Sequence, residues 1–332
     1  MPILSIIVPV YNVASYLREG LDSLINQGLN DIEIICINDG STDNSLDILK
    51  EYEKICNNLI VITQKNKGVS SARNKGLSIA QGTYITFFDP DDIVSSQMYS
   101  KMVDIALLHT LDIVICAYQT NLSNHCVRHP FTKERVVNPI ELIKENTFLH
   151  SSNAFSFSWR MIFKNTFLQQ NDLKYHEQIS IGEDTLFNME AIFKAQKLYY
   201  LDEPLYIHRI DNISSAMNQR YKPQLEQSLQ LQVAEKKRII KTYNVNQYTP
   251  ITQDMSEDIV KRYTLMLFNN LRNNPNEPDK LKGIKRILNM PMITDAMKVV
   301  GFRNIYPSWK EYIFYLAMKF KWAWLVHKLY FR

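Results

Sequence analysis

The first 120 residues alternate between short apolar runs and segments whose apolar residues recur every three to four positions. Five apolar runs rich in β-branched residues have the pattern of buried strands, at residues 3–9, 32–37, 59–63, 84–88 and 112–118. Four amphipathic segments between them have the pattern of helices, at residues 16–27, 45–56, 70–81 and 97–108. This alternation predicts an α/β fold with right-handed β-α-β connections and a mostly parallel central sheet flanked by helices.

The alternation stops after residue 118. Residues 119–150 are polar and loop-like, with a short helix expected at 139–146, and residues 153–210 are mixed, with a strand-like region at 198–205. Beyond residue 221 the pattern becomes helical at 223–243 and 256–273, and the Asn- and Pro-rich stretch 273–278 interrupts it. The sequence therefore predicts a helical C-terminal extension.

Composition narrows the class of protein only slightly. The chain has 332 residues, 45% of them hydrophobic and 22% charged, and a formal net charge of +4, which is too small to indicate a nucleic-acid partner. The four cysteines form no Cys-x-x-Cys pair, so we expect buried thiols in a reducing compartment and no zinc site. We also expect no signal peptide, and no membrane-spanning helix because no apolar run reaches about 18 residues.

Polar clusters follow three of the predicted strands, at residues 11–12, 38–41 and 89–92. In an open α/β sheet, ligands bind beyond the carboxyl ends of the strands, so these clusters are expected to converge in space. Asp89-Pro90-Asp91-Asp92 places three carboxylates within four residues. Such oxygen ligands suit Mg²⁺ or Mn²⁺, which commonly bridge a carboxylate to a diphosphate. The alternative is a solvated turn, for which Asp-Pro-Asp is also suitable.

Two further residues have chemistry suited to a nucleotide. Asp39 ends the second strand, and its carboxylate can accept a hydrogen bond from an imide N–H such as that of uracil. Arg73 lies in the first turn of the helix predicted after Gly68, and a helix N-terminus with a guanidinium suits a diphosphate. The chain lacks both the P-loop spacing and a Gly-x-Gly-x-x-Gly motif, which disfavours a dinucleotide-binding fold.

Four motifs in this order and spacing resemble the family 2 glycosyltransferases, whose fold is GT-A. They are Val8-Pro9-Val10-Tyr11-Asn12, Asn38-Asp39-Gly40-Ser41-Thr42-Asp43, residues 66–76 and Asp89-Pro90-Asp91-Asp92. The match is strong over about the first 120 residues and weaker to about residue 215. The resemblance implies a nucleotide-sugar-binding half at 1–120, an acceptor-binding half at 121–220, and a helical extension at 221–332.

The resemblance also implies roles for the matching residues of the donor half. Pro9 and Tyr11 border the nucleoside, Asp39 holds the uracil edge, and Arg73 lies near the ribose or diphosphate. Asp89 approaches the ribose and the metal, Asp91 is a ligand of the metal bound to the diphosphate, and Asp92 acts indirectly.

In the acceptor half, the sequence Ile181-Gly182-Glu183-Asp184 resembles the family's Glu-Asp pair, whose aspartate is the general base. The resemblance therefore implies Asp184 as base and Glu183 as its neighbour; the alternative is an acidic pair favoured by a helix dipole. Where the family often has two aromatic residues and an arginine, this chain has Tyr206-Ile207-His208-Arg209. His208 is placed near the diphosphate or the metal, and Arg209 near a phosphate.

Trp159 precedes an apolar run and is either an acceptor-side wall or a core residue. Residues 301–332 carry six basic residues, one acidic residue and three of the four tryptophans. This composition suits an amphipathic segment on the cytoplasmic face of an anionic membrane, the alternative being a packed C-terminal helix.

Together these features predict an inverting, metal-dependent hexosyltransferase. It moves a sugar from a UDP-sugar to a hydroxyl of a glycan acceptor, lipid-linked in our interpretation, in the biosynthesis of a bacterial capsule, lipopolysaccharide O-antigen or lipooligosaccharide. We expect a cytoplasmic protein, peripheral on the inner face of the cell membrane, with no nucleic-acid partner. The alternatives are an inactive membrane-associated scaffold and a nucleotidyltransferase, although the first strand lacks the glycine-rich basic loop of the latter. A processive synthase is disfavoured because its Gln-x-x-Arg-Trp motif is absent.

Overall fold

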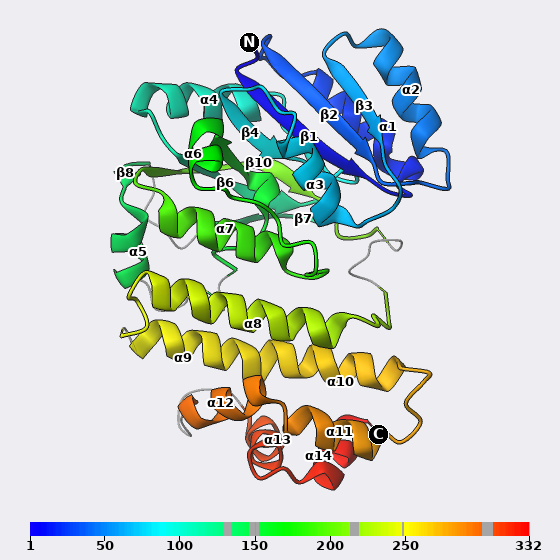
Figure 1. Ribbon diagram of the computed structural model, residues 1–332, viewed down its shortest axis with the longest axis vertical. Helices are drawn as coiled ribbons and strands as arrows, with labels where there is room; N and C mark the ends of the chain where they lie inside the picture. Colours follow the sequence, from blue (N-terminus) through cyan, green and yellow to red (C-terminus); the bar gives the residue numbers. More distant parts are fainter. Residues whose placement is uncertain are drawn as a thin grey trace. The chain divides into compact units, whose positions relative to one another are not determined.

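The computed structural model describes residues 1–128, 134–145, 150, 153–212, 219–247, 249–300 and 308–331 (Figure 1). The chain divides into two compact units. The first, which we call the sheet unit, comprises Met1–Glu145 and Phe155–Ile213. The second, the helical unit, comprises Asn146–Ala154 and Ser214–Arg332. The helical unit thus takes one short segment from the middle of the chain.

The sheet unit contains one mixed sheet, and its first half follows the predicted pattern. Four strands pair in parallel in the order β3-β2-β1-β4: β1 (Leu4–Val10), β2 (Ile32–Asn38), β3 (Leu59–Thr63) and β4 (Tyr84–Phe87). Four helices connect and cover them: α1 (Ala14–Ile25), α2 (Ser45–Ile55), α3 (Val69–Leu77) and α4 (Met98–His109). The predicted strands and helices of this half are confirmed, with ends shifted by a few residues.

Alternate residues of β1 face opposite layers of the sheet unit. Ile6 and Val8 belong to a core that includes Leu21 of α1 and Met102 of α4. Ile7 points the other way, against Gly76 of α3. This alternation is the period of two expected for a strand buried on both faces.

The second half of the sheet differs from the simple pattern. A four-residue strand, β9 (Met161–Lys164), lies antiparallel between β4 and β6 (Ile113–Thr120). The long strand β10 (Leu198–His208) is parallel to β6 and antiparallel to β5 (Ile93–Val94). The parallel ladders are the longer ones, so the predicted α/β fold with a mostly parallel sheet is confirmed.

The expectation that residues 119–150 are loop-like is wrong in part. Strand β6 runs on to Thr120 and pairs with β7 (Ser123–Val127), and β8 (Val136–Val137) pairs with β10. The polar end of β6 forms a strand because it pairs on both sides, with β10 and with β7, and these pairings are not visible in the local sequence pattern. The short helix is present as α5 (Pro139–Glu145); residue 146 lies outside the described residues.

Three further helical segments complete the sheet unit: η1 (Ser158–Arg160), α6 (Asn165–Gln170) and α7 (Glu183–Lys194). Helix α7 packs its buried apolar residues toward β4, where the Phe87 and Phe187 rings meet edge to face at 5.5 Å. Gly182 precedes α7 with φ of 72°, a left-handed conformation that favours glycine. The chain therefore turns sharply just before Glu183 and Asp184.

The helical unit confirms the predicted C-terminal helices. Its described elements are α8 (Leu225–Thr242), α9 (Thr249–Asp258), the π-helical turn η3 (Ile259–Tyr263), α10 (Thr264–Asn273), α11 (Lys280–Leu288), α12 (Pro291–Val299), α13 (Trp309–Lys319) and α14 (Ala323–Tyr330). The helix expected at 256–273 starts earlier, at Thr249, and ends at the predicted interruption. The segment from the middle of the chain is tied in by hydrogen bonds from His150 to Asp254 and from Arg262 to Asn153.

The predicted amphipathic tail forms α13 and α14, which pack within the helical unit while leaving aromatic residues exposed. Tyr315 and Val326 are buried, whereas Trp309, Trp322 and Trp324 are exposed. Arg303 and Arg332, two of the basic residues in the prediction, lie outside the described residues. Among the residues that the structure describes, no helix is both long and apolar enough to cross a bilayer.

Helix α3 lies so close to β1 that only glycine fits at position 76. A Cβ atom there would lie 2.4 Å from Ile7 Cγ2, which is buried. We expect Gly76→Ala to lower the free energy of unfolding by about 1–2 kcal/mol, because overpacking outweighs the gain in helix propensity. Urea denaturation measures this. Gly28→Ala is the control, since its Cβ would meet nothing closer than 3.8 Å; an equal effect of both substitutions would contradict the prediction.

Candidate active site

Asp39 lies at the carboxyl end of β2, and its side chain organises the loop that leads into α3. One carboxylate oxygen accepts hydrogen bonds from Gln64 Nε2 at 2.8 Å and from the Lys67 N–H at 2.9 Å. The other accepts from the Gly68 N–H at 2.8 Å, directly before α3 begins. Asp39 is 3% exposed. The side chain therefore fixes the N-terminus of the helix that carries Arg73.

The residues after β1 lie beside this loop because β1 and β2 pair in register, Pro9 with Ile37 and Val10 with Asn38. Pro9 is buried, whereas Tyr11 is 50% exposed. The side chain of Asn12 accepts a hydrogen bond from the Thr42 N–H at 2.8 Å, which ties the two strand ends together. Tyr11 thus presents an accessible aromatic ring next to the Asp39 loop.

Arg73 connects the two halves of the sheet unit. Its Nη2 pairs with Asp89 at 2.9 Å and its Nη1 with Glu183 at 2.8 Å. The guanidinium lies 5.1 Å from the centre of the Tyr175 ring, which in turn stacks on Phe187 of α7 at 4.3 Å. The side chain is 5% exposed, and although burial lowers its pKa, these neighbours raise it on balance above the ordinary value. Arg73 is therefore a permanent cation shared by two carboxylates.

The three carboxylates after β4 have different surroundings. Asp92 is buried and accepts hydrogen bonds from the Tyr206 hydroxyl at 2.7 Å and the Arg209 N–H at 2.6 Å, so its carboxylate is held by β10 and the residue after it. Asp91 is more open and accepts from Asn212 Nδ2 at 2.7 Å. Burial and the charge of Asp92 raise the pKa of Asp91. Burial also raises the pKa of Asp89, against the opposing effect of Arg73.

His208 at the end of β10, and Arg209 directly after it, contact the carboxylate loop Asp89–Asp92. His208 Nδ1 lies 3.3 Å from the Asp92 carboxylate; burial lowers the pKa of His208, but this contact raises it on balance. Arg209 donates from Nε to the Asp91 carbonyl at 2.7 Å and from Nη2 to Glu19 at 2.6 Å. These contacts anchor the Asp-Pro-Asp-Asp loop from the opposite strand.

Glu183 and Asp184 are the first two residues of α7, directly after the turn at Gly182. Both oxygens of Asp184 are oriented by backbone donors, the Phe157 N–H at 2.8 Å and the Thr185 N–H at 2.7 Å. A carboxylate has about four acceptor positions, so capacity remains for an incoming hydroxyl. Burial and the charge of Asp184 raise the pKa of Glu183, although Arg73 opposes the shift. Of the two acids, Glu183 is engaged by a cation, whereas Asp184 is engaged by two backbone amides and, at 3.4 Å, by the Thr185 hydroxyl.

Trp159 is a core residue rather than an exposed wall. It is 3% exposed, its ring stacks on Tyr206 at 4.0 Å, and it lies 5.3 Å from the His208 ring. These ring contacts pack Trp159 against the C-terminal end of β10, which carries Tyr206 and His208. The interpretation of Trp159 as a core tryptophan is therefore the one that fits the structure.

Several residues that position the site were not among the predicted site residues. Asn212 holds Asp91, and Phe157 adopts a left-handed backbone conformation with φ of 70° where it donates to Asp184. Asn74 exchanges two hydrogen bonds with the Tyr175 backbone, which fixes the ring beneath Arg73. Only Asn74, within the third motif, lay in a segment that the sequence had singled out.

The structure brings the predicted residues into one connected group. Arg73 joins Asp89 to Glu183, and Asp91 and Asp92 are held by the end of β10. Asp39 is connected to this group indirectly, because it binds the backbone at the start of α3, the helix that carries Arg73. The described residues contain no group of three or more His, Cys, Asp or Glu side chains placed to hold a metal. Asp89 and Asp91 nonetheless offer the carboxylate oxygens that Mg²⁺ or Mn²⁺ prefers, and burial together with neighbouring carboxylates raises the pKa of both.

The sequence profile of glycosyl transferase family 2 matches residues 5–193, which contain all four motifs and the Glu183-Asp184 pair. The chain belongs to glycosyl transferase family 2. It is therefore a glycosyltransferase, an enzyme of the hexosyltransferase type as the sequence predicted.

Known family members are similar over most of the chain. The Bacillus subtilis (strain 168) protein described as uncharacterized glycosyltransferase EpsJ is 36% identical over 307 residues, 92% of this chain and 88% of its own length. A poly(ribitol-phosphate) beta-glucosyltransferase of Bacillus spizizenii is 32% identical over 225 residues, 66% of this chain and 34% of its own length.

The fold is that of known glycosyltransferases. The crystal structure of S. aureus TarS 1-349 in complex with UDP-GlcNAc has a TM-score of 0.71 at 19% identity, covering 99% of this chain and 90% of that one. At this identity the likeness shows the fold alone, and it confirms the GT-A fold.

Proposed function

We propose that this family 2 enzyme is an inverting, metal-dependent glycosyltransferase that moves a sugar from a UDP-sugar to a hydroxyl of a glycan acceptor in bacterial surface polymer synthesis. The observation that carries the proposal is the Arg73 bridge, which holds Asp89 and Glu183 on one guanidinium. This bridge links Asp89, on the predicted donor side, to Glu183, the neighbour of the predicted base. The names of relatives, a beta-glucosyltransferase of poly(ribitol phosphate) among them, support surface polymer synthesis.

In this proposal, residues 1–120 bind the nucleotide sugar. Tyr11 and Pro9 border the base, and Asp39 shapes and lines the uracil site through the loop that it holds. Asp89 approaches the ribose, and Arg73 acts mainly by positioning Asp89 and Glu183, since its side chain is already engaged by both. The solved complexes of TarS with UDP and with UDP-GlcNAc support a uridine nucleotide as the donor class.

Asp91 and Asp89 would hold Mg²⁺ or Mn²⁺ with the diphosphate. When bound, the metal supplies positive charge to the departing diphosphate. His208 lies on the same side, next to the diphosphate or the metal, with its Nδ1 held by Asp92. Arg209 supports the Asp91 backbone and adds positive charge near the phosphates.

Asp184 is the proposed general base. It takes the proton from the acceptor hydroxyl while the hydroxyl oxygen forms a bond to the anomeric carbon. The bond between that carbon and the diphosphate oxygen breaks, and the nucleoside diphosphate leaves with the electron pair. The attack occurs from the side opposite the leaving group, so an α-linked donor gives a β-linked product. Glu183 stays bound to Arg73 and keeps the start of α7 in position.

Residues 121–220 contribute the acceptor half, and residues 221–332 form the helical extension. We place the protein in the cytoplasm, peripheral on the inner face of the cell membrane, with a lipid-linked glycan as acceptor. The exposed tryptophans of α13 and α14, together with the lysines of residues 308–331, support contact with an anionic membrane surface.

A panel of UDP-sugars tests the proposal, with UDP release measured with and without Mn²⁺. We expect release from one UDP-sugar that increases with the acceptor and is lost when the metal is chelated. Asp91→Asn is expected to raise the Mn²⁺ concentration for half-maximal activity at least tenfold, because one of few carboxylate ligands is removed. Asp104→Asn, an exposed acid on α4, is the control. No release from any UDP-sugar would overturn the donor class, and unchanged Mn²⁺ dependence of the variant would overturn the role of Asp91.

A further inference from the structure

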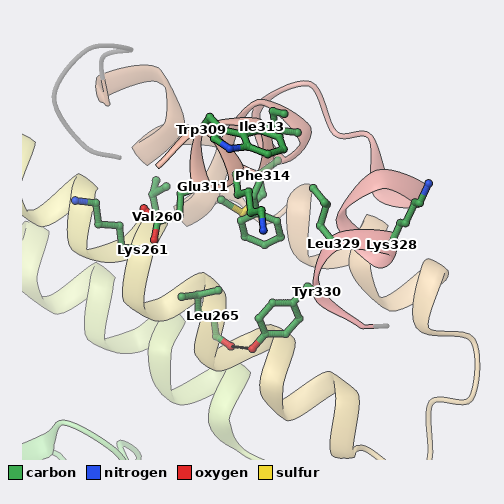
Figure 2. Close-up of a pocket in the computed structure, with 12 residues that line it drawn as sticks. Val260, Lys261, Leu265, Trp309, Glu311, Ile313, Phe314, Lys328, Leu329 and Tyr330 are labelled. Carbon is green, nitrogen blue, oxygen red and sulfur yellow. Dashed lines mark hydrogen bonds between the residues drawn. The ribbon is translucent and has the colours of Figure 1, made fainter. Parts of the chain in front are cut away.

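The helical unit contains a pocket of about 740 Å³ between helix α10 with its preceding π-helical turn and the two C-terminal helices (Figure 2). Its apolar lining includes Leu265, Trp309, Ile313, Phe314, Leu329 and Tyr330. Binding sites for small molecules have volumes of about 300–1,000 Å³ and are mostly apolar. The pocket thus has the size and lining of a ligand site, and the family match ends well before it, at residue 193.

Two rings that line the pocket, Phe314 and Tyr330, pack against each other and against Phe268, which lies behind them. Phe268 is fully buried and meets Phe314 at 6.2 Å and Tyr330 at 5.7 Å, and the latter two rings lie 6.0 Å apart. The Tyr330 hydroxyl donates to the Leu265 carbonyl at 3.4 Å, as Figure 2 shows. Rings held in this way are not expected to fold into the space above them.

The mouth of the pocket exposes apolar surface to water. Trp309 is 69% exposed, Leu329 47% and Leu265 40%, and all three line the pocket. Trp322 and Trp324 are exposed nearby in the chain without lining it. Contiguous exposed apolar side chains of this kind mark an interaction site.

The charged residues that line the pocket are mostly basic, which favours an anionic ligand. Lys261, Lys310 and Lys328 line it together with a single acid, Glu311. Figure 2 shows Lys261 and Lys328 on opposite sides of the apolar centre. An apolar space bordered by an excess of ammonium groups complements a molecule with a hydrocarbon chain and an anionic head.

We propose that this pocket binds one anionic phospholipid of the membrane, with an acyl chain against the Phe314 and Tyr330 rings and the phosphate beside one of the bordering lysines. Burial of the CH₂ groups of one chain adds an attachment that surface charge alone does not provide. The inference rests on the proposed association with an anionic membrane and deepens it, from a surface contact to a defined lipid site.

Dioctanoyl phosphatidylglycerol, used below its critical micelle concentration, tests the pocket without a bilayer. Calorimetric titration of the full chain is expected to show saturable binding, at least tenfold tighter than that of dioctanoyl phosphatidylcholine or of glycerol phosphate. Leu265→Glu places a negative charge in the pocket and is expected to weaken binding at least tenfold. Leu281→Glu is the matched control, because Leu281 is 41% exposed and does not line the pocket.

Thermal unfolding and UDP release by both variants are expected to match those of the wild type, since neither leucine belongs to the proposed catalytic site. Equal binding of the two lipids, or equal binding by the two variants, would overturn the lipid site. A tenfold preference for a prenyl phosphate would replace the phospholipid by a lipid-linked substrate. A dimer that Leu265→Glu dissociates, without lipid binding, would assign the pocket to a second copy of the chain.

Sedimentation with phosphatidylglycerol vesicles distinguishes a failure of the lipid pocket from a failure of the proposed membrane association. Wild-type protein that sediments with vesicles yet binds no dioctanoyl lipid would refute the pocket and leave the membrane surface. Wild-type protein that does not sediment at all would refute the membrane association itself.

Discussion

Asp184→Asn is expected to lower the rate of glycosyl transfer by about 10²- to 10⁴-fold, the usual contribution of a general base. The amide cannot take the proton of the acceptor hydroxyl, while the shape of the side chain is kept. Binding of UDP, measured by calorimetry, is expected to change less than threefold, because the proposed mechanism assigns Asp184 to the acceptor hydroxyl and not to the nucleotide. The rate is measured as UDP release at saturating donor and acceptor.

The same substitution also has a predictable structural cost. Both oxygens of Asp184 accept backbone N–H groups, so the amide NH₂ of asparagine would face one of those donors. We therefore expect a modest fall in the thermal midpoint, and the kinetic comparison is made well below it. Asp172→Asn, an exposed acid of the sheet unit paired only with Lys174 in the described contacts, is the control. Transfer at the wild-type rate in Asp184→Asn would remove this residue from the role of base.

Arg73→Met is expected to lower the free energy of unfolding by about 3–5 kcal/mol, the cost of breaking a buried ion pair by removing one partner. Asp89 and Glu183 would then share a poorly hydrated space without the cation between them. Arg73→Lys is expected to recover only part of the loss, because an ammonium does not reproduce the two-armed geometry of the guanidinium. Urea denaturation followed by circular dichroism gives these differences.

Two comparisons separate the bridge from a general effect of removing an arginine. Arg18→Met breaks an ion pair with Glu51 in which both side chains are more than half exposed, and it is expected to leave the unfolding midpoint unchanged. The double variant Arg73→Met with Glu183→Gln is expected to be more stable than Arg73→Met, because one of the two opposed carboxylates becomes neutral. An unaltered midpoint in Arg73→Met would show that the bridge does not hold the halves together.

The first half of the sheet unit could be predicted because its signals are local. Each strand from β1 to β4 is a continuous apolar run, and each helix between them has its own periodicity. The four motifs at the strand ends could likewise be placed at one edge, since parallel strands end together. The GT-A fold and the family followed from these local features.

The second half of the sheet and the contacts of the site depend on pairs of residues far apart in the chain, which no local sequence pattern reveals. The apolar run at residues 161–163 was visible, but the insertion of β9 between β4 and β6 was not, because so short a segment does not specify its neighbours. The partners of Arg73 are 16 and 110 positions away along the chain, so its position in a bridge became evident only in three dimensions. The contact of Asp39 with the base stays a prediction, whereas its three hydrogen bonds within the protein, which shape the loop before α3, had no signal in the sequence.

The segment Asn146–Ala154 belongs to the helical unit although both of its flanks belong to the sheet unit. The polypeptide consequently passes from one unit to the other three times. A shortened chain that ended after residue 213 would retain His150 and Asn153 but discard their hydrogen-bond partners Asp254 and Arg262. The C-terminal helices are therefore no detachable module, and exchanging them between homologous enzymes requires transplanting this internal stretch as well.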